Sequence, residues 1–189
     1  MLRRLMLTAM LAGAATTLQA QELELALSDA MAELILADRT TQSDQQSARY
    51  GGGLLFNEDR DLLGSLFLTV DNEVEGRWQP ITFGVGVKLY GADLDRSGES
   101  LAALAIGGNV GVGIPADIPL ALVFQGYISP NITTGGDASR ITEGQLRLEA
   151  EVVRGAHAFL GYRRIKIRMD SFRDERVDDG FHVGLRLRF

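Results

Sequence analysis

The strongest constraint on the fold of this chain is a period of two in its apolar residues. Over the last nine residues, 181–189, every second side chain is a Phe, Val or Leu, and His, Gly or Arg stands between them. Successive side chains of a β-strand point to opposite faces, so the pattern predicts a strand whose two faces meet different surroundings. The same alternation recurs along most of the chain, for instance over 81–89, 102–114 and 141–153.

Segments of this kind predict an all-β protein, a closed antiparallel up-and-down transmembrane β-barrel of about 8–10 strands. Ten strands are counted if a tight first hairpin around Ser28 and Asp29 belongs to the wall, and eight if that hairpin lies outside it. The expected strands are 22–27, 31–39, 47–57, 61–71, 77–92, 100–114, 119–129, 140–153, 157–170 and 179–189.

The connections in the second half of the chain alternate in length. PADIP at 115–119 and VRGA at 153–156 are short, whereas 93–100, 129–140 and 170–178 are longer and polar. Outer-membrane barrels have short periplasmic turns and longer extracellular loops. We therefore expect the short turns and Phe189 on the periplasmic side.

Alternation alone does not tell a membrane barrel from a soluble one. In a lipocalin-like periplasmic carrier the apolar face would line a ligand cavity, whereas in a membrane barrel it faces lipid and the charged face fills the interior. Small residues alternate with bulky apolar ones between 82 and 113. On an inner face, such residues would leave room in a narrow lumen for bulky side chains from the opposite wall.

The first twenty residues have the order of a secretory signal peptide. Arg3 and Arg4 precede an apolar run and then small residues up to Ala20, which predicts a signal peptide at 1–20 and the barrel at 21–189. The chain has no cysteine, which excludes disulfides and thiol chemistry. Its formal net charge of −6 argues against a nucleic-acid partner.

The C-terminus resembles an outer-membrane assembly signal. His182, Gly184, Leu187 and Phe189 match the polar-x-Gly-x-x-hydrophobic-x-aromatic pattern that the barrel assembly machinery reads in bacterial outer-membrane proteins. Together with GVKLYGADLDRSGESLAALAIGGNVGVGIP at 86–115 and FLGYRRIKI at 159–167, the ending DDGFHVGLRLRF resembles the YfaZ family of small outer-membrane barrels. The resemblance implies a fold and a location in the outer membrane of a Gram-negative cell envelope, and it implies no activity.

Charged residues on the predicted inner face form the candidate site. Acids gather on one expected strand and bases on the next two, and consecutive antiparallel strands are neighbours, so we expect a network of ion pairs filling the lumen. Arg163 falls on the face expected to point outward, which suggests a bulge around 162–164 or a position near an interface. The expected lumen network is Glu143, Arg147, Glu149, Glu151, Arg164, Lys166, Arg168, His182, Arg186 and Arg188.

Motifs for catalysis, cofactors or metals are weak. His157 and His182 are the only histidines, and neither stands at a metal-ligand spacing or beside a nucleophile motif. The acidic segment DLDRSGES at 93–100 does not match a calcium-binding EF-hand loop, and the Gly-x-Gly steps at 84–86 and 111–113 belong to strands. We expect no enzymatic activity, no cofactor and no metal.

The sequence favours a small outer-membrane barrel with a structural or surface-binding role, acting through its extracellular loops. Its expected partners are the lipid bilayer, lipopolysaccharide and, during insertion, the barrel assembly machinery. The alternatives are an outer-membrane enzyme, a narrow ion-selective pore, and a soluble lipocalin-like carrier.

Overall fold

The computed structural model describes residues 21–43, 45–75, 80–94, 99–169 and 174–189, and almost all of these are in β-strands. One single-turn 3-10 helix, η1, interrupts them at Asn131–Thr133. The strands are β1 (Glu22–Leu27), β2 (Met31–Ser43), β3 (Gln46–Asn57), β4 (Leu62–Glu75), β5 (Pro80–Leu94), β6 (Glu99–Ile114), β7 (Leu120–Ile128), β8 (Thr134–Gly136), β9 (Ala138–Val153), β10 (Ala156–Met169) and β11 (Asp174–Arg188).

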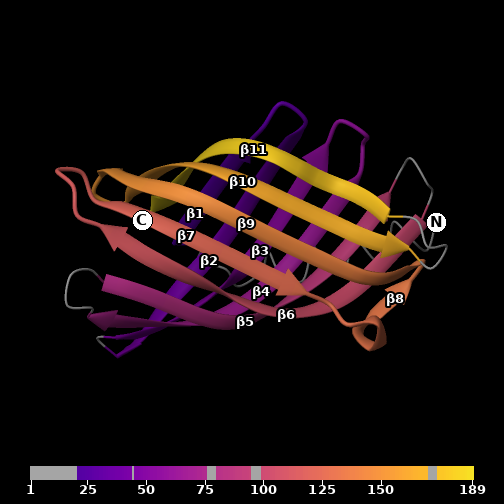
Figure 1. Cartoon of the computed structure of the whole chain (residues 1–189), viewed down its shortest axis with the longest axis horizontal. Coiled ribbons are helices and arrows are strands. Elements are labelled where there is room, and N and C mark those ends of the chain that lie inside the picture. Colours follow the sequence, from indigo (N-terminus) through magenta and orange to yellow (C-terminus); the bar gives the residue numbers. More distant parts are fainter. Residues whose placement is uncertain (1–20, 44, 76–79, 95–98, 170–173) are drawn as a thin grey trace.

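Ten of these strands close into a barrel in which every pair is antiparallel (Figure 1). The sheet runs β5-β4-β3-β2-β1-β11-β10-β9-β7-β6, and pairing of β5 with β6 completes the cylinder. The first and last strands are hydrogen-bonded neighbours, and the Phe189 N–H donates to the Gln21 carbonyl oxygen at 2.8 Å. The first hairpin is therefore part of the wall, which decides for ten strands rather than eight.

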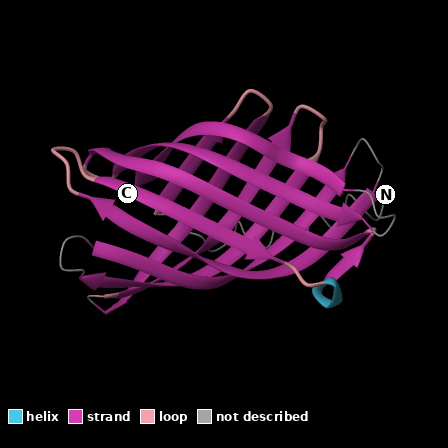
Figure 2. Ribbon diagram, viewed as in Figure 1, coloured by secondary structure: helices cyan, strands magenta, loops and turns pink. Residues whose placement is uncertain are grey.

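The two ends of the barrel differ in their connections. We define the terminal end as the end of the barrel that contains Gln21, Phe189 and the turns at 115–119 and 154–155. The opposite end, which we call the loop end, contains the turns at 28–30 and 58–61 and the connection 129–137. The last of these is the longest described connection and contains η1 and the short β8, which pairs with β6 (Figures 1 and 2). The expected loops 93–100 and 170–178 lie partly outside the described residues. Strands β5 and β6 extend into the first of them and β11 into the second.

The outer wall is mainly apolar and the terminal half of the interior is polar, as expected for a membrane barrel. Leu25 of β1, Val85 of β5, Phe124 of β7 and Leu185 of β11 all point outward and are exposed. The inner parity of the same strands carries Glu24, Lys88, Gln125 and Arg186. This distribution contradicts the lipocalin-like alternative, in which apolar side chains would line the cavity.

Glycines on the inner face give the narrow lumen its room. A Cβ atom at Gly84 of β5 would stand 2.1 Å from Asp71 Oδ1 and 2.9 Å from Asn109 Nδ2. Asp71 of β4 and Asn109 of β6 lie on the two strands that flank β5, and Asn109 donates a hydrogen bond of 3.0 Å to Asp71. Only glycine at position 84 leaves space for this contact. The expected small inner residue is therefore present at this position, but it makes room for side chains of the two neighbouring strands and not for bulky ones from the opposite wall.

Strand β10 corrects one expectation about orientation. Arg163 lies in the lumen and is only 2% exposed, and its neighbours on the same parity, including Ile165 and Ile167, are also buried. The register with β9 is continuous from His157 to Arg168, so no bulge at 162–164 is needed. The register shift lies further on, where Ile165 pairs with Asp178 and Lys166 with Arg176. Val177 is the extra residue of that bulge.

Among the described residues, no helix combines the length and the apolar character needed to cross a bilayer. The signal peptide predicted at 1–20 lies outside the described residues and remains a prediction.

Candidate functional site: the charged lumen

The terminal half of the lumen contains a network of buried arginines and glutamates. Glu22 and Glu24 come from β1, Arg147 and Glu149 from β9, and Arg186 from β11. The sequence places them inward because each alternates with Leu, Val or Ala on the outer wall. The pairing of β1 with β11 brings acids of the first strand next to bases of the last, although more than 160 residues separate Glu24 from Arg186.

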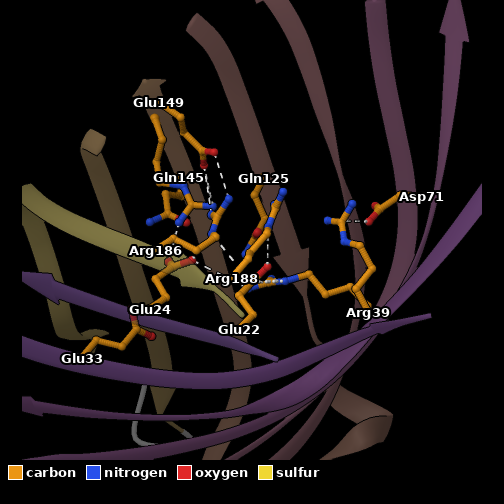
Figure 3. A network of polar contacts seen from close by, with 12 residues as sticks. Glu22, Glu24, Glu33, Arg39, Asp71, Gln125, Gln145, Glu149, Arg186 and Arg188 are labelled. Atoms are coloured by element: carbon orange, nitrogen blue, oxygen red, sulfur yellow. Dashed lines mark hydrogen bonds and ion pairs between the residues drawn. The ribbon is translucent and has the colours of Figure 1, made fainter. Parts of the chain in front are cut away.

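Arg186 is the centre of this network (Figure 3). Its Nε donates to Glu24 Oε2 at 2.7 Å, and its Nη1 and Nη2 donate to the two carboxylate oxygens of Glu149 at 2.9 and 3.1 Å. Arg147 joins the same two acids, at 2.6 Å to Glu24 and 3.0 Å to Glu149. The two-pronged contact with Glu149 uses the geometry in which a guanidinium binds a carboxylate most strongly.

Glu22 extends the network towards the terminal end. It accepts hydrogen bonds from Arg49 Nε of β3 at 2.8 Å and from Arg188 Nε of β11 at 3.1 Å. Beyond it, Arg39 Nη2 lies 3.8 Å from Asp71 Oδ2. We call the terminal network the set of four arginines, Arg49, Arg147, Arg186 and Arg188, and three glutamates, Glu22, Glu24 and Glu149, so it carries one excess positive charge.

A second cluster lies around Glu143 of β9. Lys88 Nζ donates to its two carboxylate oxygens at 2.8 and 3.1 Å, Tyr90 donates its hydroxyl, and Gln125 Nε2 lies at 3.4 Å. The Lys88 ammonium also stands 5.0 Å from the centre of the Tyr90 ring. These contacts compensate for burial of the only described lysine on the inner wall, because a buried charge without partners is strongly destabilising.

A third cluster centres on Arg163 of β10. Its guanidinium contacts Glu33 of β2, its Nε donates to Asp178 Oδ2 of β11 at 2.7 Å, and Nη2 lies 3.3 Å from Met31 Sδ. Two carboxylates thus share one arginine, all deeply buried. A cavity of about 40 Å³ lies between the three clusters, where Asp71, Lys88 and Arg163 are among its lining residues. It has room for ordered water and for no larger solute.

The loop half of the lumen is filled by apolar side chains. These residues come from eight strands and point inward, and Ile141, Ile165 and Ile167 are at most 1% exposed. They form a dry core above the charged clusters, and we call them the apolar plug. Its members are Met31, Leu55, Leu63, Leu94, Leu101, Ile141, Ile165, Ile167, Met169 and Val177.

The plug explains where the expected site residues lie. Inner positions are occupied by Glu143, Arg147, Glu149, His182 and Arg186, with His182 Nε2 3.0 Å from Gln145 Nε2. Glu151 and Arg188 lie at the terminal rim, where Glu151 accepts the Gly155 N–H. The expectation that Arg164, Lys166 and Arg168 lie in the lumen is wrong, because Ile165, Ile167 and Met169 take the inner positions of β10 and turn these three outward.

Seven of the twelve charged residues in the three clusters were not among those expected from the sequence. Glu22, Glu24, Glu33, Arg49, Lys88, Arg163 and Asp178 all lie inside. The segment ELELAL at 22–27 held a usable signal, since its acids alternate with leucines as on the later strands. Lys88 was also visible as the one charge on a face otherwise built from small residues and Tyr90.

The histidines lie apart from any described metal-binding group. Within the described residues, no three or more His, Cys, Asp or Glu side chains gather as metal ligands. The ring of His182 packs edge-on against Phe159, with centroids 5.9 Å apart, and His157 lies at the start of β10. The arrangement pairs opposite charges and fills space.

A family model matches nearly the whole chain. The family model described as YfaZ precursor matches residues 4–189. A search of the curated proteins gives no match. Among solved structures, the chain is similar to the outer-membrane expressed OmpT of Vibrio cholerae, at 14% identity and a TM-score of 0.39. That alignment covers 84% of this chain and spans only 56% of the other.

Proposed function

We propose that this chain, which belongs to the YfaZ family, acts as a closed structural barrel whose lumen does not conduct and whose loop end binds partners at the cell surface. The protein is a β-barrel of the bacterial outer membrane. A closed sheet satisfies its own backbone hydrogen bonds in hydrocarbon, and this one has an apolar outer wall. The proposal concerns what such a barrel does there.

The observation that carries the proposal is the filled lumen. In its terminal half, Arg186 and Arg147 bridge Glu24 of β1 and Glu149 of β9, which are separated by two strands, and in its loop half the apolar plug fills the interior. An ion crossing this interior would have to break several buried ion pairs and then cross a dry apolar layer. A structural role therefore fits the described interior better than a pore.

The orientation follows from the connections. We place the terminal end in the periplasm, where the short turns at 115–119 and 154–155 belong, and the loop end outside the cell. The C-terminal residues Leu187 and Phe189 then stand exposed on the outer wall near the periplasmic surface. In this position they are available to the barrel assembly machinery during insertion, together with His182 and Gly184 on the inner parity.

Planar-bilayer conductance of the refolded protein tests the proposal. We expect no discrete openings from the wild-type chain. We expect brief openings of small conductance from a variant in which the plug residues Ile141, Ile165 and Ile167 are all changed to Ser, because water can then enter the apolar layer and only the ion pairs of the terminal half still oppose passage. A matched variant with three outward changes, Leu146, Leu160 and Val183 to Ala, should stay silent. Steady single-channel currents from the wild-type protein would instead support the ion-selective pore.

A further inference from the structure

Strand β10 turns Arg164, Lys166 and Arg168 to the outer wall, where the charged lumen does not account for them. The outer face of β9, β10 and β11 towards the loop end carries five basic residues, which we call the basic belt. Four are exposed and Lys166 is half-buried. The belt consists of Arg140, Arg164, Lys166, Arg168 and Arg176.

Strand register brings like charges of the belt directly opposite each other. Arg140 pairs with Arg168 across β9 and β10, and Lys166 pairs with Arg176 across β10 and β11. The two rows lie two residues apart along β10, a separation of about 7 Å. Like charges in direct cross-strand positions destabilise a sheet. An anion beside each pair reduces this repulsion.

Acidic partners compensate for part of the belt. Asp179 lies 3.5 Å from Arg164 Nε and 3.5 Å from Arg176 Nη1, and it accepts the hydroxyl of Tyr162. The backbone of Asp174 stands opposite that of Arg168. Lys166 and Arg168 also have interaction partners. The belt is therefore anchored in place, and its two like-charged rows remain side by side on an outward face.

The belt begins where the apolar band of the wall ends. Below it on the same strands stand Leu148, Leu160 and Leu185, all exposed and apolar. At the boundary, the rings of Tyr162 and Phe181 pack edge to face with centroids 5.2 Å apart, as in the aromatic girdles of membrane barrels. The belt thus lies at the level of lipid headgroups.

The belt occupies one sector of the barrel only. Around the rest of the described wall, the outward side chains nearest the loop end are uncharged or acidic. They are Leu27, Ala32, Phe56, Leu62, Asp93, Ser100 and Ile128. Among the described residues, the loop end carries one exposed base outside the belt, Arg60 in the turn 58–61, so the bases gather on one side of the barrel.

We propose that the basic belt binds the phosphate groups of lipopolysaccharide in the outer leaflet. Guanidinium and ammonium groups are the side-chain groups that bind phosphates most strongly. A headgroup with two phosphates can contact both rows of the belt at once. The inference uses the orientation proposed above, with the loop end outside. It is independent of whether the lumen conducts.

The test uses the full-length mature chain refolded in maltoside micelles, which contain no phosphate. Binding of fluorescent lipopolysaccharide is measured by anisotropy for the wild type and for Arg140→Gln/Arg176→Gln, which removes one cation from each row. Arg60→Gln/Arg154→Gln, in exposed turns at opposite ends, is a control with the same change in net charge. Dephosphorylated lipopolysaccharide and phosphatidylglycerol are the ligand controls.

A basic residue at a membrane surface contributes roughly fivefold to binding of an anionic lipid, so we expect the belt variant to bind lipopolysaccharide about 25-fold more weakly. The turn variant should bind like the wild type, and dephosphorylated lipopolysaccharide and phosphatidylglycerol should bind at least tenfold more weakly to the wild type. Equal affinity of the belt and turn variants would overturn the proposal. So would equal binding of either ligand control. Heat-dependent gel mobility checks that each variant is folded. Binding in micelles does not depend on the orientation of the barrel in a membrane. Failure of this test would therefore not count against the proposed closed lumen.

Discussion

The three lumen clusters differ in how well they tolerate the loss of an arginine, and Arg163 should be the least tolerant. Arg163 is the cation with which both Glu33 and Asp178 form their ion pairs. Arg163→Met would leave two buried carboxylates close together with no compensating charge. Loss of Arg186 is less severe, because Glu24 and Glu149 keep Arg147, and the terminal network then has three arginines for three glutamates.

The magnitudes follow from these contacts. Breaking a buried ion pair by removing one partner costs about 3–5 kcal/mol, and we expect Arg163→Met to lie at the upper end of this range. Arg186→Met should cost at least about 1 kcal/mol less, even though Arg186 donates three hydrogen bonds to carboxylates, because its acids retain a partner. Arg188→Gln, at the rim and 38% exposed, should cost under about 1 kcal/mol.

Urea titration in micelles, followed by the fraction of heat-modifiable folded protein on gels, measures the free energy of unfolding for each variant. Adding Glu33→Gln to Arg163→Met should restore part of the lost stability, since one of the two uncompensated charges disappears. The reasoning would be refuted if Arg186→Met proved more destabilising than Arg163→Met, or if Glu33→Gln lowered stability further in the Arg163→Met background.

Two further predictions concern the last strand. A Cβ atom at Gly184 would stand 2.2 Å from Phe159 Cζ and 2.4 Å from the Leu25 carbonyl oxygen. Gly184→Ala should therefore destabilise the barrel by about 1–3 kcal/mol in the same urea titration. Gly180→Ala is the control and should be close to neutral, because a Cβ atom there would have no atom within 4 Å. Phe189 is 80% exposed and holds Gln21 through its backbone alone, so Phe189→Ala should change stability in micelles by under about 1 kcal/mol. In cells the same variant should lower the amount of folded protein in the outer membrane, and unchanged amounts would count against its role as an assembly signal.

The fold could be predicted from the sequence because strand periodicity carries it directly. The ten expected strands match the ten of the wall, and most of their ends agree within a few residues; the start of β11, at Asp174 rather than 179, differs most. The short β8 was missed because three residues, Thr134–Gly136, are too few to show alternation. The place of the first hairpin in the wall depends on pairing between β1 and β11. Alternation within one strand gives no information on which strands pair.

The site was harder to predict because the lumen is not uniformly polar. A rule that apolar side chains face lipid works for β11, but it fails on β10, where Ile165 and Ile167 pack into the apolar plug. Periodicity assigns two faces to a strand and does not tell which is inside. Arg163 was the available clue, since a charge on the supposed lipid face contradicted the assignment that later proved wrong.

The central claim is that the outer wall meets lipid while the charged clusters and the apolar plug are enclosed. Methyl-selective NMR of the unmodified chain in lipid micelles tests it directly through cross-peaks between side-chain methyl groups and acyl chains. The account predicts such cross-peaks for Leu160 and Leu185 on the wall and none for Ile165 and Ile167 in the plug. Acyl-chain contacts at Ile165 and Ile167, with none at Leu160 and Leu185, would contradict it.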